Sequence, residues 1–203
     1  MKRFSISEAA YEAALEALKT GQVIALPTDT AYGLAASWED ETACRMIYQI
    51  KDRAMDQPLI LLADSLELLL PFCVWNQAAQ RLADEFWPGA LTLILPATDR
   101  VPFWVNSGGS TIGVRIPAHP VPRHLSRELQ APLATTSANR SGQPSPRSGD
   151  AVWDQLHDSA LALLLDDGST VGSADSTIVD LVGRRILRAG GIPPETIQEV
   201  FSL

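Results

Sequence analysis

The chain has 203 residues, of which 46% are hydrophobic, and a formal net charge of −8. This length supports the core of one domain, and the acidic balance disfavours a general nucleic-acid binder, which presents excess Lys and Arg to phosphates. No apolar run reaches the roughly 18 residues of a membrane-spanning helix, and the first residues lack the apolar stretch of a signal peptide. Cys44 and Cys73 are isolated, which indicates neither a disulfide framework nor a zinc site. We therefore expect a cytoplasmic protein with no membrane contact.

The predicted elements start with an amphipathic helix. A capping-box pattern, Ser5-Ile-Ser-Glu8, precedes apolar residues that recur at helical spacing. A short apolar strand is expected next, over residues 22–26, and a second helix begins at about Glu41. This second helix ends in a Lys-x-Arg sequence, so two cations lie at its C-terminus.

Strands and helices alternate through the rest of the chain. Further strands are expected over residues 59–62, 90–95, 111–116, 133–136, 161–165, 177–181 and 185–188. Further helices are expected over residues 65–70, 77–87 and 194–201. Because some strands are consecutive and others are separated by helices, the pattern predicts an α/β protein with a mixed sheet. No linker divides the chain, so residues 1–203 are expected to form one domain.

Two N-terminal segments carry candidate chemistry. The first, Pro27-Thr-Asp-Thr-Ala-Tyr-Gly-Leu34, follows a strand and offers two hydroxyls and a carboxylate. A ligand-binding turn and an Asx-turn in which Asp29 caps a helix explain this segment equally well. The second, Lys51-Asp-Arg53, either pairs with the dipole of the helix end or supplies a point charge and a bidentate fork to phosphate or carboxylate.

Polar groups also follow later strands. The run Ser107-Gly-Gly-Ser-Thr111 can present backbone N–H groups to an anion, and Arg115 lies within the apolar strand that comes after it. A buried Arg needs a carboxylate partner from the protein or from a ligand, and we favour the ligand. The small polar side chains of Thr135-Thr-Ser-Ala-Asn139 can surround phosphate and ribose oxygens, although an ordinary Ser/Asn turn remains the alternative.

Several common catalytic motifs are absent from the sequence. It contains no GxxxxGK[ST] phosphate loop, no GxGxxG after a strand and no GxSxG elbow. His119, His124 and His157 lack the spacing of zinc ligands, so no metal site is expected from the protein's own side chains.

The combination of motifs is more informative than any one of them. In chain order they are Pro27-Thr-Asp-Thr-x-Tyr-Gly-Leu34, Lys51-x-Arg53, Pro58-Leu59, Pro88-Gly-x-x-Thr92, Arg115-x-Pro117, Ser137-x-Asn139 and Ser176-Thr-x-Val-Asp180. Together they resemble the YrdC/TsaC family of threonylcarbamoyl-AMP synthases, from about residue 8 to residue 191, in its short single-domain form. The resemblance implies an open, twisted α/β sheet with flanking helices around a large concave, positively charged cavity.

The same resemblance implies roles for individual residues. The catalytic signature falls on Lys51, Arg53, Ser137 and Asn139. The implied threonine contacts are Thr30, Arg115 and Ser176. The implied ATP contacts are Arg53, Gln57, Thr111, Ser137, Ser145 and Arg188. Ala31 and Ala54 replace a more common Val and Pro, and neither change removes a charge or a hydroxyl.

The implied activity is that of a nucleotidyltransferase. It makes threonylcarbamoyl-AMP from L-threonine, bicarbonate-derived CO2 and ATP, with release of pyrophosphate. The product serves the threonylcarbamoyl modification of adenosine in tRNAs that read codons beginning with A, through a separate transferase complex. Because every participant is an anion, the site needs cations and N–H donors more than an acid–base pair, and Mg²⁺ is expected to accompany ATP. A carbamate decays in water, so residues 140–149 are the candidate lid.

Two other interpretations stay open on the sequence alone. A nonenzymatic RNA-binding module would also use a basic cavity, but the acidic composition and the lack of interleaved aromatic residues weigh against it. A domain that transfers carbamoyl groups from carbamoyl adenylate is the other, although such domains usually lie within much larger chains.

Overall fold

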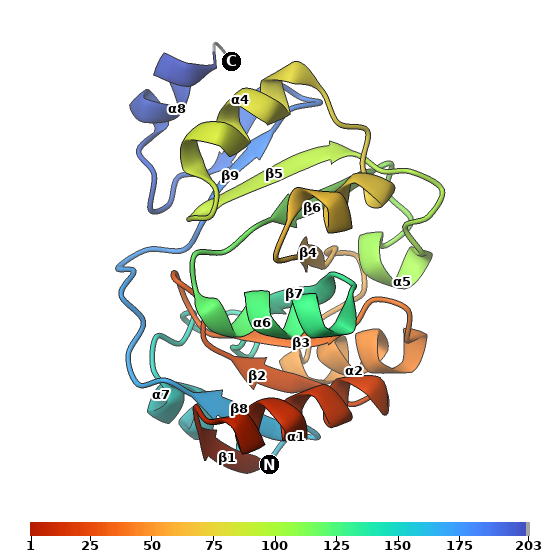
Figure 1. Ribbon diagram of the computed structural model, residues 1–203, viewed down its shortest axis with the longest axis vertical. Coiled ribbons are helices and arrows are strands. Elements are labelled where there is room, and N and C mark those ends of the chain that lie inside the picture. Colours follow the sequence, from red (N-terminus) through yellow and green to blue (C-terminus); the bar gives the residue numbers. More distant parts are fainter. Residues whose placement is uncertain (202–203) are drawn as a thin grey trace.

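The computed structural model describes residues 1–201, which form a ten-stranded mixed sheet with helices on both faces (Figure 1). In chain order the strands are β1 (Lys2–Ser5), β2 (Ile24–Leu26), β3 (Gly33–Ser37), β4 (Ile60–Leu62), β5 (Leu91–Pro96), β6 (Thr111–Arg115), β7 (Leu133–Ser137), β8 (Leu163–Asp166), β9 (Thr177–Asp180) and β10 (Arg185–Arg188). The helices are α1 (Glu8–Lys19), α2 (Glu41–Lys51), α3 (Leu66–Leu69), the 3-10 helix η1 (Leu70–Phe72), α4 (Gln77–Phe86), α5 (Phe103–Asn106), α6 (Pro120–Leu129), α7 (Gly149–Leu156) and α8 (Pro194–Val200). The predicted mixed α/β fold is confirmed.

The strand order is β1-β8-β2-β3-β7-β4-β6-β5-β9-β10, so the sheet is open and its two edges are β1 and β10. The pairs β1–β8, β2–β8, β4–β6 and β5–β9 are parallel, and the other neighbours are antiparallel. Between β8 and β9 the chain passes from one half of the sheet to the other along one side of the molecule (Figure 1). We call residues 167–176 of this connection the crossover segment. It leads into β9, which pairs with β5 in the other half of the sheet.

The two faces of the sheet are covered because side chains alternate along its strands. In β2, Ile24 and Leu26 pack with α1 and α6, whereas Ala25 faces the larger core on the other side. The helices present matching faces. In α1 the buried residues Ala10 and Ala14 recur at helical spacing, which confirms the predicted amphipathic helix.

Helix α2 places two motif residues at the centre of the molecule. Asp40 caps its N-terminus by accepting a hydrogen bond from the Ala43 N–H at 2.9 Å. At the other end Asp52 adopts a left-handed conformation with φ of 51°, which terminates the helix directly before Arg53. Lys51 belongs to the buried face of the helix, so its side chain points into the protein.

The start of α1 differs from the prediction. Ser7 is the capping residue, since its Oγ accepts a hydrogen bond from the Ala10 N–H at 3.2 Å, whereas Ser5 ends strand β1. Lys2 pairs with Leu163 of β8, and this parallel ladder keeps Ser5 extended and away from the helix. The predicted capping box at Ser5 is therefore wrong.

Several elements were not predicted, among them β3 and α6. Strand β3 follows immediately after the polar turn at residues 27–32, and it is buried on both faces, so it lacks alternation. Helix α6 starts with Pro120 and Pro122, which its first turn tolerates because the first N–H groups need no partner within a helix. His119 caps α6 through Nδ1, which accepts a hydrogen bond from the Val121 N–H at 3.2 Å.

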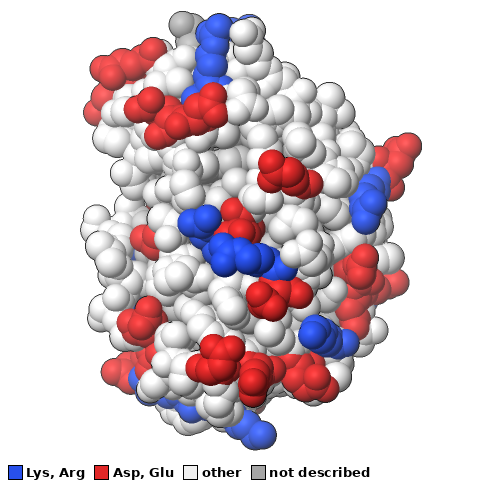
Figure 2. Space-filling view, viewed as in Figure 1, with Lys and Arg blue, Asp and Glu red and all other residues white. Residues whose placement is uncertain are grey.

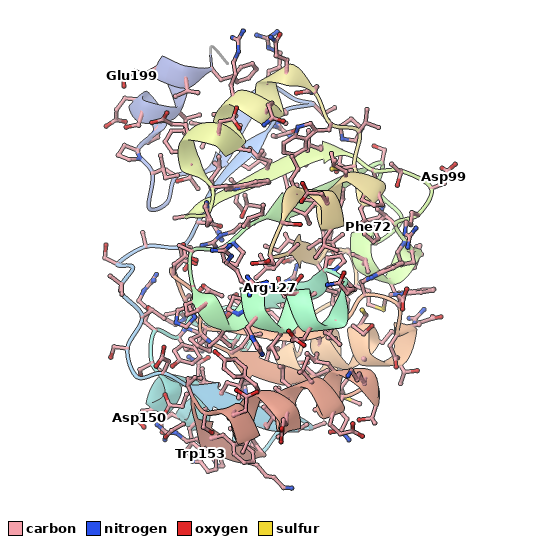
Figure 3. The ribbon with its side chains drawn as sticks, in the orientation of Figure 1. Phe72, Asp99, Arg127, Asp150, Trp153 and Glu199 are labelled. Atoms are coloured by element: carbon pink, nitrogen blue, oxygen red, sulfur yellow. The ribbon has the colours of Figure 1, made fainter. Side chains whose placement is uncertain are left out.

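The charged surface carries exposed ion pairs of mixed sign. Over the face of Figure 1, acidic and basic side chains occur in small groups without a continuous basic field (Figure 2). Arg127 on α6 donates to Asp64 at 2.8 Å, and Asp150 on α7 accepts from Arg3 at 2.7 Å (Figure 3). Exposed pairs of this kind contribute little to stability, because water screens their charges. Within residues 1–201, no helix is both long enough and apolar enough to cross a membrane.

Candidate active site

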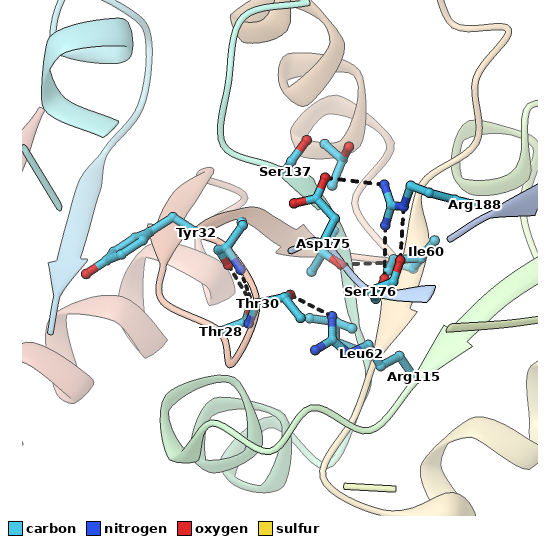
Figure 4. Close-up of a pocket in the computed structure, with 14 residues that line it drawn as sticks. Thr28, Thr30, Tyr32, Ile60, Leu62, Arg115, Ser137, Asp175, Ser176 and Arg188 are labelled. Carbon is cyan, nitrogen blue, oxygen red and sulfur yellow. Dashed lines mark hydrogen bonds and ion pairs between the residues drawn. The ribbon is translucent and has the colours of Figure 1, made fainter. Parts of the chain in front are cut away.

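A pocket of about 80 Å³ lies over the central strands of the sheet (Figure 4). Residues with hydroxyl side chains in its lining are Thr28, Thr30, Thr135, Thr136, Ser137 and Ser176, its aliphatic side chains include Ile60 and Leu62, and its charged groups are Arg115, Asp175 and Arg188. Tyr32 also belongs to the lining, but its hydroxyl points away and donates to the Gly168 carbonyl at 2.7 Å (Figure 4). The structure thus brings together five of the residues singled out from the sequence: Thr30, Arg115, Ser137, Ser176 and Arg188. The two guanidinium groups share the pocket with a carboxylate, so its lining is less positive than the resemblance implied.

The turn after β2 is built around one hydroxyl group. Oγ1 of Thr28 accepts hydrogen bonds from the N–H groups of Thr30 and Ala31, each at 3.2 Å, and donates to the carbonyl of Ala31 at 2.6 Å. This closed turn holds the Thr30 side chain at the pocket. Asp29 accepts from the Ala118 N–H at 3.1 Å and from Arg115, a role that neither interpretation of the sequence anticipated.

Arg115 is fixed at the end of β6 by three hydrogen bonds. Its Nε donates to the Gly89 carbonyl at 2.8 Å, Nη1 to Thr30 Oγ1 at 3.0 Å, and Nη2 to Asp29 Oδ2 at 2.7 Å. Burial lowers the pKa of Arg115, and the Asp29 carboxylate opposes that effect. An arginine stays charged under these conditions. The protein therefore supplies the carboxylate that we had assigned to a ligand, although the guanidinium still lines the pocket.

Arg188 and Ser176 form the opposite wall. Arg188 Nε donates to the Ser176 carbonyl and Nη2 to Ser176 Oγ, both at 3.0 Å. Ser176 Oγ also lies 2.9 Å from Thr92 Oγ1, so one hydroxyl links the guanidinium to β5. Burial lowers the pKa of Arg188, and the charge of Asp175 opposes this. The wall is therefore cationic and already ordered by contacts within the protein.

Lys51 does not line this pocket, because its ammonium is enclosed by the protein. Nζ donates to the Ser137 carbonyl at 2.6 Å, to the Asn139 carbonyl at 2.8 Å and to Asn139 Oδ1 at 3.1 Å. These acceptors match the three donors of an ammonium group. Burial, followed by the charge of Arg53, lowers the pKa of Lys51 to about 7. Lys51 thus braces the Ser137-x-Asn139 turn, and its catalytic role stays a prediction.

Asn139 and Arg53 extend this support. Asn139 Nδ2 donates to the carbonyls of Arg140 at 2.9 Å and Gln143 at 2.6 Å, which shapes the loop that follows β7. Arg53 Nη1 donates to Thr136 Oγ1 at 3.1 Å, and Nη2 donates to the Gln57 carbonyl at 2.8 Å. Because Thr136 lines the pocket, Arg53 supports the pocket lining through its hydrogen bond to Thr136. Burial lowers the pKa of Arg53.

Four predicted ATP contacts lie outside the pocket lining: Arg53, Gln57, Thr111 and Ser145. Thr111 is at the opposite end of β6 from Arg115. Ser145 belongs to the loop after β7 and donates to Asp175 Oδ2 at 3.0 Å. The candidate lid, residues 140–149, is anchored to the turn after β2, because the Pro146 carbonyl accepts a hydrogen bond from the Tyr32 N–H at 2.9 Å.

Asp29, Arg147 and Asp175 were not selected from the sequence as site residues. Arg147 donates to Asp175 Oδ1 at 3.1 Å and to the Thr30 carbonyl. The sequence offered one signal for the two carboxylates, which is that each precedes a predicted threonine contact: Asp29 precedes Thr30, and Asp175 precedes Ser176. All three act through contacts between distant segments.

Comparisons with known proteins agree with the resemblance. A family model for Sua5, YciO and YrdC proteins, described as "Telomere recombination", matches residues 16–190. The threonylcarbamoyl-AMP synthase of Vibrio campbellii is 37% identical over 184 residues, which cover 89% of this chain and 98% of that protein. The threonylcarbamoyl-AMP synthase of Pyrococcus abyssi is 38% identical over 187 residues, which cover 91% of this chain but 55% of that protein.

A solved structure extends the comparison to the fold. The crystal structure of P. abyssi Sua5 complexed with L-threonine matches with a TM-score of 0.92 and 37% identity, covering 99% of this chain and 60% of that chain. This chain therefore spans little more than half of the Pyrococcus protein and nearly all of the Vibrio protein. The family match covers most of the residues that build the pocket, and we conclude that the chain belongs to the Sua5/YciO/YrdC family.

Proposed function

We propose that this protein is a nucleotidyltransferase that makes threonylcarbamoyl-AMP from L-threonine, bicarbonate and ATP, and releases pyrophosphate. The observation that carries the proposal is the pocket, in which Arg115 and Arg188 stand among Ser and Thr hydroxyls in a chain of this family. The names of the Vibrio and Pyrococcus relatives and the threonine-bound Sua5 structure support the same reaction. The protein would act as one domain over residues 1–203, of which residues 202 and 203 lie outside the described part.

The pocket suits a small hydroxylated amino acid. Arg115 offers a guanidinium to the threonine carboxylate, while Thr30 and Ser176 offer hydroxyls on either side. Ile60 and Leu62 supply aliphatic surface, which fits a β-methyl group better than a second charge. This division of polar and apolar groups supports threonine as the amino acid.

The reaction needs positioning and charge stabilisation. The threonine amine adds to CO2 derived from bicarbonate and loses a proton, which gives an N-carboxylate. One oxygen of that carboxylate attacks the α-phosphorus of ATP, and the bond to pyrophosphate breaks. Negative charge accumulates on phosphate oxygens during this step, so fixed cations and hydroxyl donors lower its barrier. Arg188, Ser137 and Arg53 would meet these oxygens and hold the nucleotide in line with the N-carboxylate.

Lys51 and Asn139, the remaining residues of the catalytic signature, would support the site without contacting the substrates. Lys51 and Asn139 fix the Ser137-x-Asn139 turn and the loop after it. Gln57 and Thr111 lie beyond the pocket lining and stay predicted ATP contacts, as does Ser145. No covalent intermediate on the protein is required.

Mg²⁺ would enter with ATP. The carboxylate that lines the pocket, Asp175, already accepts from Ser145 and Arg147, so the lining fits a resident divalent cation poorly. Magnesium commonly binds through substrate phosphates with few protein ligands, and it would neutralise phosphate charge there. A threonylcarbamoyl-transferase complex that modifies adenosine in tRNA is the proposed consumer of the product.

The test is release of pyrophosphate from ATP by the purified protein, with threonine and bicarbonate each present or omitted. Mass spectrometry would identify the carbamoyl adenylate. We expect turnover only with both co-substrates, and serine in place of threonine should react more slowly. Binding of tRNA without turnover would contradict the proposal and favour the RNA-binding alternative.

A further inference from the structure

Asp175 is an acidic side chain in a pocket whose proposed nucleotide ligand is a polyanion. Among the described residues that line the pocket it is the one carboxylate, and its side chain is 29% exposed. Neither the sequence motifs nor the names of the relatives assign it a role. A carboxylate repels phosphate, so its place beside the proposed ATP contacts needs a physical explanation.

The Asp175 carboxylate connects three segments of the chain. Oδ2 accepts a hydrogen bond from Ser145 Oγ at 3.0 Å, and Oδ1 accepts one from Arg147 Nη2 at 3.1 Å. Arg188 lies on the other side, with Nη1 3.6 Å from Oδ2 (Figure 4). One side chain of the crossover segment therefore holds the loop after β7 and the end of β10 together.

The backbone of Asp175 is tightly placed, which gives the carboxylate a defined position. Its carbonyl accepts a hydrogen bond from the Gly191 N–H at 2.8 Å. A Cβ atom at Gly190 would lie 2.2 Å from that carbonyl oxygen, so the chain after β10 can pack here only as glycine. The anchor for Ser145 and Arg188 is consequently rigid.

Arg147 carries this network to the proposed threonine contacts. It donates to the carbonyls of Thr30 and Gly172, the latter at 3.2 Å. A Cβ atom at Gly172 would lie 2.5 Å from the Asp29 carbonyl oxygen, so the crossover segment packs directly on the turn that holds Thr30. The loop after β7, the crossover segment and this turn are thus one connected structure.

We propose that Asp175 is a positioning residue whose carboxylate holds Ser145 and Arg188 in place for ATP. The proposal rests on the synthase function proposed above, in which both side chains contact the nucleotide. Without a shared anionic partner, Arg147 and Arg188 repel each other, and the Ser145 side chain regains rotamer freedom that ATP binding must then remove. Asp175 thus weakens the attraction for phosphate slightly but pre-organises the groups that bind it.

Asp175→Asn tests this role because the amide keeps the shape and one acceptor but removes the charge. Pyrophosphate release is measured with ATP varied, and then with threonine varied. We expect the KM for ATP to rise about fivefold to tenfold, as for loss of one charge-assisted contact, with kcat and the KM for threonine nearly unchanged. Asp175→Glu, which keeps the charge one methylene farther out, should give an intermediate KM. Calorimetric binding of ATP alone should weaken by the same factor as the KM.

Asp150→Asn is the matched control, because it removes the same charge from an arginine partner, Arg3, on the exposed side of α7. Its kinetic constants should equal those of the wild type, and similar thermal midpoints for all variants exclude unfolding as the cause. An unchanged or lower KM for ATP in Asp175→Asn, or a rise confined to threonine, would overturn the proposal. A wild-type protein without threonine-dependent turnover would instead contradict the synthase function, so the two failures are distinct.

Discussion

The protein uses its motif cations in two opposite ways. The Lys51 ammonium is 3% exposed and is enclosed by oxygens of Ser137 and Asn139. Arg115 and Arg188 are also held by the protein, yet both line the pocket. An ammonium has three donors and exhausts them on three acceptors, whereas a guanidinium has five and can bind protein and ligand at once.

This contrast separates support from contact within one family signature. A lysine in a phosphate-binding motif invites the interpretation that its charge meets the phosphate. Here the charge organises a backbone turn, and the groups free to meet ligands are arginine N–H groups and hydroxyls. Replacement of Lys51 and replacement of an arginine should therefore have different effects on activity and stability, and the following variants test this.

The largest effect is expected for Arg115→Met. The change removes the proposed partner of the threonine carboxylate and leaves Asp29 without its cation, and loss of one member of a buried pair costs about 3–5 kcal/mol. We expect kcat/KM for threonine to fall by roughly a thousandfold, together with a loss of stability in urea unfolding.

Arg127→Met is the control for Arg115→Met, since Arg127 pairs with Asp64 but has a side chain that is 54% exposed. Its stability and its kinetics should stay close to those of the wild type, because water screens an exposed ion pair. Equal losses in the two variants would show that burial of the Arg115 pair has no special importance.

A smaller effect is expected for Lys51→Met, and it should fall on stability and activity together. The methionine fills the space but leaves the carbonyls of Ser137 and Asn139 without their donor, which costs about 2 kcal/mol. The turn then loosens, and pyrophosphate release should fall by roughly a hundredfold, or about 2.7 kcal/mol. Lost activity with unchanged urea unfolding would mean that the ammonium acts on the phosphate directly.

The parts of the fold that local signals determine were predictable from the sequence. Helix α2 follows from its Asp40 cap and its apolar spacing, and this placed Lys51 and Arg53 correctly at its end. Strand β1 could not be predicted in this way, because Phe4 is its one apolar side chain and the strand is ordered by pairing with β8. Because β8 is distant from β1 along the chain, their parallel pairing leaves no hydrophobic pattern in the sequence around β1.

The site shows the same limit. Five of the residues that line the pocket were selected through the family resemblance, and no spacing rule alone would have assembled them. The partners that set the charge of the pocket were missed: Asp29 and Arg115 are 86 residues apart, and Ser145 and Asp175 are 30 apart. Which carboxylate meets which cation depends on tertiary proximity, which is why we assigned Arg115 to a ligand before its protein partner was visible.

The smallest predicted effect concerns pH and again separates Lys51 from the arginines. Its folded-state pKa of about 7 lies below the ordinary lysine value of 10.5, because burial and Arg53 disfavour the charge. Between these values the folded protein binds fewer protons than the unfolded chain, so stability from this group rises with pH across that window. Below pH 7 the lysine is charged in both states, and the cost of burying the charge is fully present.

Lys51→Met isolates this dependence, because methionine does not titrate. Urea unfolding of both proteins at pH 7 and pH 9 should show the wild type gaining about 1–2 kcal/mol relative to the variant at the higher pH. The arginines stay charged throughout this range and contribute nothing to the difference. A difference in unfolding free energy between the two proteins that does not change with pH would contradict this prediction. It would mean that the acceptors at Ser137 and Asn139 keep Lys51 fully charged despite its burial, so that their hydrogen bonds to Lys51 are charge-assisted at every pH tested.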